Sequence, residues 1–255
     1  MAWQRYVALG DSFTEGLDDP DPRTDGVFRG WADLTAGVLA AQVDRFEYAN
    51  LAIRGRLYDA IVAEQLEPAL AMKPDLISFA AGGNDVLRKS CDPPTLMARF
   101  EDSVRKLRAS GADVLVFRFA NLVDRLPGGK LIAPRVKYLN DAVVRIADEH
   151  GCKLINLWDD EAYANPAMWS VDRLHMSAYG HHRVAAHVLT ALDVPVPDGW
   201  WDEPTWPRPS WARARANDIH WAGTHLAPWI KRRLTGRSSG DNLEPKRPLP
   251  GPVNH

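Results

Sequence analysis

Short apolar segments alternate with longer segments of helical periodicity along the first 192 residues. The strand-like segments are 5–9, 46–50, 76–80, 114–119 and 153–156. The helix-like segments, in which apolar residues are spaced by three and four, are 31–41, 57–71, 95–110, 134–150 and 177–192. Because strands and helices alternate, the sequence predicts an α/β fold with a parallel sheet and helices on both faces.

Composition places the chain in an ordinary class. Its 255 residues are 45% hydrophobic and 25% charged, which is typical of a soluble globular protein with one sizeable core. No stretch is long and apolar enough for a membrane span, and the first strand begins too early for a signal peptide. The two cysteines, Cys91 and Cys152, fit free thiols in a reducing compartment. We therefore expect a cytoplasmic protein.

The chain changes character after residue 194. We expect one α/β domain over 1–194. A Trp/Pro-rich strap with a basic C-terminal helix, packed on this domain, is expected over 195–234. A weakly ordered basic tail is expected over 235–255. Residues 1–204 hold 22 basic against 30 acidic side chains, whereas residues 205–255 hold 9 against 3. Such a tail either contacts an anionic partner surface or lies on the acidic surface of the protein itself.

Polar residues follow three of the predicted strands. Ser12 follows the first strand in Gly-Asp-Ser, Gly55 follows the second, and Asn84 follows the third in Gly-Gly-Asn-Asp. The carboxyl ends of parallel strands share one edge of the sheet, where open α/β folds place their ligand sites. These three residues should therefore converge, with Ser12 as a candidate nucleophile.

A base for this serine is found far downstream. Asp172 precedes His175 by three residues at the start of a predicted helix, so the carboxylate can hold one ring nitrogen while the other faces Ser12. The backbone N–H groups of Ser12 and Gly55 and the side-chain amide of Asn84 are suitable oxyanion donors. Asp11 is expected to tie loops together through hydrogen bonds.

Four blocks resemble, in order, the signature blocks of the SGNH (GDSL-type) hydrolase family. They are Gly10–Gly16, Asn50–Gly55, Gly82–Asp85 and Asp172–His175. The resemblance implies a flavodoxin-like three-layer α/β/α sandwich with five parallel strands. It also implies Ser12 as nucleophile, His175 as base, Asp172 as its orienter, and Ser12, Gly55 and Asn84 as oxyanion donors. The family acts on esters and thioesters without metal or cofactor, and some members are acyltransferases.

The sequence therefore predicts a serine esterase, with an acyltransferase or a non-catalytic binding module as alternatives. Arg54 and Arg56 flank Gly55, where many relatives have small polar residues. The acidic loop 18–26 is expected to be a flap beside the site, because the ligand spacing of an EF-hand is absent. His181 and His182 are expected on a solvated helix face. Substrate and oligomeric state stay open.

Overall fold

A single twisted sheet organises the chain in the computed structural model, which describes residues 3–126, 128–207, 221, 223–224 and 239–253. Its strands are β1 (Arg5–Leu9), β2 (Glu47–Asn50), β3 (Leu76–Phe79), β4 (Asp113–Arg118), β5 (Lys153–Asn156) and β6 (Arg247–Pro252). They lie in the order β5-β4-β3-β1-β2-β6, and β1 to β5 pair in parallel. The predicted α/β class and its five parallel strands are confirmed.

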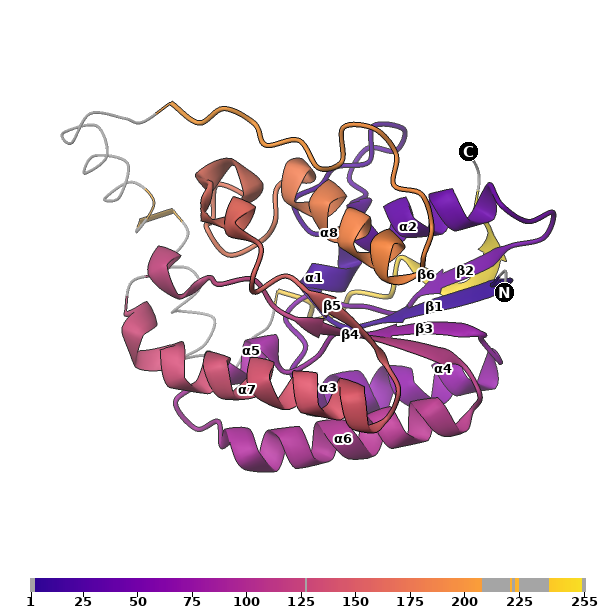
Figure 1. The fold of residues 1–255 in the computed structure, drawn as a ribbon, viewed down its shortest axis with the longest axis horizontal. Helices are drawn as coiled ribbons and strands as arrows, with labels where there is room; N and C mark the ends of the chain where they lie inside the picture. Colours follow the sequence, from indigo (N-terminus) through magenta and orange to yellow (C-terminus); the bar gives the residue numbers. More distant parts are fainter. Residues whose placement is uncertain (1–2, 127, 208–220, 222, 225–238, 254–255) are drawn as a thin grey trace.

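Helices cover both faces of the sheet (Figure 1). One face carries α2 (Gly30–Ala40) and α8 (Ala178–Ala191), whose apolar sides bury Trp31 and Val184. The opposite face carries α3 (Tyr58–Ile61), α4 (Glu67–Ala71), α6 (Pro93–Ala109) and α7 (Gly129–Glu149). Phe100 and Val143 are fully enclosed in that second core. The result is a three-layer sandwich in which the central strands contact apolar side chains on both sides.

Short elements occupy the ends of the strands. Helix α1 (Ser12–Glu15) follows β1, and α5 (Gly83–Val86) follows β3. The 3₁₀ segments are η2 (Val123–Arg125), η3 (Glu161–Ala164) and η4 (Pro166–Met168). The π segment η1 (Val62–Leu66) interrupts the helix predicted over 57–71. Within η1, buried Gln65 exchanges two hydrogen bonds with the backbone of Gly10, which fixes the chain just before Ser12.

The end of the chain differs from the expected weakly ordered tail. Residues 247–252 form β6, which pairs antiparallel with β2 and makes the sheet a mixed one of six strands. Its prolines are compatible with an edge position, because the missing N–H groups need no partner on the open side. β6 also covers an edge of β2 that would otherwise be unpaired. Because proline is unusual in strands, the sequence did not predict β6.

The strap runs along α8 (Figure 1). The Trp200 ring lies 5.4 Å from His182, and the Trp201 ring lies 4.9 Å from His187 between ring centroids. Trp206 is half exposed, and the expected helix near 219–234 lies largely outside the described residues. Of the nine basic residues after 204, the described Lys246 and Arg247 both contact the body. No helix in the described parts of the chain has the length and apolarity to cross a membrane.

Candidate active site

Ser12 lies at the carboxyl end of β1 as the first residue of α1. The side chain of Asp11 caps this helix by accepting a hydrogen bond from the Phe13 N–H, and its other oxygen accepts one from Nδ2 of Asn84 (2.9 Å). As expected, Asp11 ties loops together. Since the first N–H groups of a helix have no partner within it, the N–H of Ser12 can serve a ligand.

His175 reaches this serine from the loop before α8. The Asp172 carboxylate accepts hydrogen bonds from the backbone N–H groups of Leu174 and His175, each at 2.9 Å. Its second oxygen lies 2.5 Å from Nδ1 of His175, and Nε2 of the same ring lies 2.9 Å from the Ser12 hydroxyl. Asp172 therefore fixes the proton on Nδ1 and leaves Nε2 as the acceptor for the serine proton. The structure thus brings Ser12 together with His175, which lies 163 positions later in the sequence, and with Asp172.

Asp172 and His175 each stabilise the charged form of the other. Burial alone would raise the pKa of Asp172, but the hydrogen bond and charge of His175, with two backbone N–H groups, lower it to about 2. Burial alone would lower the pKa of His175, but Asp172 raises it above its ordinary value, helped by the charges of Asp18 and Asp11. Asp172 is therefore ionised at neutral pH and favours a positive charge on the imidazole.

Asn84 and Gly55 follow β3 and β2, the two strands that flank β1 in the sheet. Nδ2 of Asn84 donates to Asp11 and to the carbonyl of Arg56 (3.1 Å), so both amide hydrogens already have partners. A developing oxyanion would have to replace one of them. Gly55 adopts φ +75° in the turn after β2, a conformation that favours glycine. This turn is docked on α1, because Arg54 bonds Glu15 through its N–H and its guanidinium.

A cavity of about 90 Å³ opens beside Ser12 and His175. Gly55 is not among the described residues that line it, whereas Asn84 is. Most of its wall is apolar and comes from loops at the carboxyl ends of β1, β3 and β4 together with α7 and the His175 loop. The apolar lining residues are Phe13, Leu17, Val86, Leu87, Phe119, Ala120, Leu122, Val136, Leu139, Trp169, Leu174 and Met176. Such a cavity accommodates a small apolar group.

Two groups of side chains have the composition of a metal site within the described residues. Asp18, Asp172 and His175 have ligand atoms within 4.8 Å of one another, as do Glu101, Glu149 and His150. In the first group both imidazole nitrogens already bind Asp172 and Ser12. In the second, Arg145 pairs with both glutamates. Neither arrangement favours a bound cation over its protein partners.

Several contacts of the site have no clear signal in the sequence. Gln65 and Asp18 are examples, since nothing in their local sequence shows what they contact. The expectation for His181 is wrong: its side chain is buried, with Nδ1 accepting from the Trp31 N–H and Nε2 donating to the carbonyl of Leu17. The helical pattern misleads here because loop 16–29 folds over this face of α8. Burial lowers the pKa of His181 to about 4, so the ring is neutral.

Comparisons with known proteins identify the family and the fold of the chain. The family model of the GDSL-like lipase/acylhydrolase family matches residues 8–183. The search of curated protein sequences gives no match.

Among solved structures, the crystal structure of TesA has 23% identity and a TM-score of 0.60, covering 74% of this chain and 98% of its own. An Axe2 mutant, an acetyl-xylooligosaccharide esterase from Geobacillus stearothermophilus, has 19% identity and a TM-score of 0.63, covering 79% and 97%. Esterase EstA from Pseudoalteromonas sp. has 16% identity and a TM-score of 0.58, covering 74% and 97%. At these identities, the three structures establish a shared fold.

Proposed function

The chain belongs to the GDSL-like lipase/acylhydrolase family, and from this membership we propose that it is a serine esterase with the triad Ser12, His175 and Asp172. The observation that carries the proposal is the continuous hydrogen-bonded chain from Asp172 through His175 to the Ser12 hydroxyl. Each link has the length of a hydrogen bond, and each side chain has the chemistry that its role requires.

The reaction follows from these positions. Nε2 of His175 takes the proton of Ser12 as its oxygen attacks the acyl carbonyl, and Asp172 stabilises the imidazolium that forms. The N–H groups of Ser12 and Gly55 and the amide of Asn84 stabilise the oxyanion, with Asn84 releasing Asp11 or Arg56 to do so. His175 then protonates the leaving alcohol, and water hydrolyses the acyl-enzyme by the same route in reverse.

The cavity beside Ser12 suggests which acyl groups are used. An apolar cavity of ~150 Å³ holds benzene, with six carbon atoms. By that scale the cavity of about 90 Å³ holds roughly four carbons. We therefore infer a preference for short acyl groups near butyryl over both acetyl and long chains.

The test is hydrolysis of p-nitrophenyl esters from C2 to C16 by the wild-type protein and by Ser12→Ala. We expect the variant to lose about 10³- to 10⁶-fold in kcat while its circular dichroism spectrum is unchanged. A fluorophosphonate probe should label the wild-type protein at Ser12, and exposed Ser90→Ala serves as the matched control. Wild-type turnover in folded Ser12→Ala would refute the assignment. If the protein is an acyltransferase, adding an alcohol acceptor to the assay should yield the ester of that alcohol. If the fluorophosphonate probe does not label Ser12 in the folded protein, the protein is a binding module.

A further inference from the structure

A second carboxylate lies beside the imidazole of His175. Asp18, in the loop between α1 and α2, has an oxygen within 4.8 Å of ligand atoms of both Asp172 and His175. Its backbone adopts φ +70°, which costs free energy for a residue other than glycine. The surrounding loop therefore holds Asp18 in a conformation that is uncommon for residues other than glycine.

The residues on both sides of Asp18 are fixed by hydrogen bonds. The carbonyl of Leu17 accepts from His181 of α8 (3.1 Å). The buried carboxylate of Asp19 accepts two bonds from the Arg29 guanidinium, at 3.1 and 3.2 Å, and one from the Gly30 N–H at 3.0 Å. The backbone before and after Asp18 is thus held against α8 and the start of α2, which keeps Asp18 beside His175.

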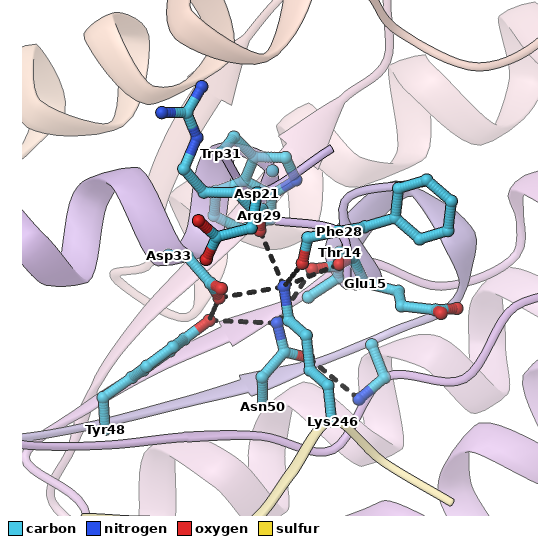
Figure 2. A network of polar contacts seen from close by, with 12 residues as sticks. Thr14, Glu15, Asp21, Phe28, Arg29, Trp31, Asp33, Tyr48, Asn50 and Lys246 are labelled. Atoms are coloured by element: carbon cyan, nitrogen blue, oxygen red, sulfur yellow. Dashed lines mark hydrogen bonds and ion pairs between the residues drawn. The ribbon is translucent and has the colours of Figure 1, made fainter. Parts of the chain in front are cut away.

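Lys246 closes the base of this loop (Figure 2). Its ammonium group donates to the carbonyl of Glu15 at 2.7 Å, where the loop begins, and to Phe28 at 3.0 Å and Arg29 at 2.6 Å, where it ends. It also pairs with Asp33 at 2.9 Å, and its side chain is only 13% exposed. One ammonium group from the segment before β6 therefore joins both ends of the loop that carries Asp18.

We propose that Asp18 is a positioning residue that acts through His175, stabilising the imidazolium that forms when Ser12 attacks the substrate. This proposal rests on the proposed function for its catalytic consequence, but its electrostatic part concerns only two side chains of the free protein. Asp172 fixes one ring nitrogen, whereas Asp18 contributes its charge from a separate loop. With both carboxylates beside it, the imidazole of His175 holds the proton that it takes from Ser12 more strongly during acyl transfer.

The groups facing His175 predict the direction of the effect. They are Asp172 on its own loop, Asp11 before α1, Asp18 on loop 16–29, and His181 on α8. Burial lowers the pKa of His181 and keeps its ring neutral. The other groups are carboxylates, and each of them favours the protonated form of His175. Replacing Asp18 by a neutral residue should therefore lower the pKa of His175. The acidic limb of kcat/KM should move to lower pH, while the plateau at high pH should fall because the base is weaker.

The experiment measures the pKa of His175 directly, by NMR titration of imidazole resonances in the wild-type protein, Asp18→Asn and Asp25→Asn. His175→Gln assigns the resonance. Asp25 is an exposed residue of the same loop, so Asp25→Asn removes the same charge away from the site. We expect Asp18→Asn to lower the pKa by about one unit, as for an opposite charge at 4–6 Å, and Asp25→Asn to leave it unchanged. Asp18→Glu should restore part of the shift.

Kinetics with p-nitrophenyl butyrate then test the catalytic consequence. The acidic limb should shift by the same amount, and the plateau of kcat/KM should fall about fivefold to tenfold in Asp18→Asn. A pKa of His175 that stays within about 0.2 unit in Asp18→Asn, or that moves equally in Asp25→Asn, overturns the proposal. The NMR titration needs no turnover, so it tests the effect of Asp18 on His175 even if the protein is not an esterase. Failure of the esterase assignment would show separately, as unchanged turnover in Ser12→Ala.

Discussion

The wall of the cavity provides the sharpest test of substrate choice. Ala120 follows β4, is 3% exposed and lines the cavity. Ala120→Leu adds three carbon atoms to a space that holds roughly four. Each buried methylene contributes about 0.8 kcal/mol, so butyryl should exceed acetyl by about 1.6 kcal/mol, or about 15-fold in kcat/KM, in the wild-type protein. In Ala120→Leu the ratio of kcat/KM for butyrate to that for acetate should fall to about one, because the butyryl chain can no longer enter the cavity.

The assay compares kcat/KM for p-nitrophenyl acetate and butyrate, so that general effects on the triad cancel in the ratio. Ala147→Leu is the matched control, since Ala147 is also 3% exposed but belongs to the core between α7 and the sheet. Both variants can lose about 1–3 kcal/mol of stability through overpacking, and only Ala120→Leu should change the ratio. A butyrate preference that survives in folded Ala120→Leu would show that the acyl chain binds elsewhere.

Two further predictions concern how loop 16–29 is held. Lys246→Met leaves Asp33 and three carbonyls without their ammonium partner, so urea unfolding should show a loss of about 3–5 kcal/mol. Exposed Lys130→Met should lose less than about 0.5 kcal/mol, and a similar loss in both variants would contradict the assigned role. Gly30→Ala places a Cβ 2.2 Å from Cα of Gly16 at φ +72°, whereas Gly26→Ala, at φ +75°, meets no atom within 4 Å. Thermal unfolding should therefore show about 1 kcal/mol lost in Gly26→Ala from backbone strain alone and at least about 3 kcal/mol in Gly30→Ala, and equal losses would refute the close approach.

The strands and helices, and the parallel pairing of β1 to β5, were predictable because they depend on local patterns. Alternating periodicity identified five strands and five helices, and the rule that parallel strands end at one edge brought Ser12 and Asn84 together. The spacing of Asp172 and His175 similarly reflects a local turn, in which the carboxylate accepts two backbone N–H groups before it reaches the ring. Signals of this kind survive in a single sequence because each depends on a few neighbouring residues.

The contacts that position these residues were not predictable in the same way. Gln65 holds Gly10 across 55 positions, and Lys246 reaches Glu15 across 231. Each is a single polar side chain in an unremarkable segment, and its partner is mostly a backbone atom, which has no side-chain signature. The composition of residues 247–252 even favours a loop, because edge strands tolerate proline where central strands do not.

The residues proposed to carry the chemistry and the residues that surround them come from different parts of the chain. The Ser12 hydroxyl and the His175 ring meet through the end of β1, which Gln65 holds at Gly10, and through the turn before α8, where Asp172 accepts two backbone N–H groups. Part of the charge around His175 comes instead from Asp18 on loop 16–29, both ends of which Lys246 contacts. Leu17 of the same loop lines the cavity. Replacing Lys246 should therefore alter the pKa of His175 through Asp18, and the same NMR titration of the imidazole resonances measures this shift.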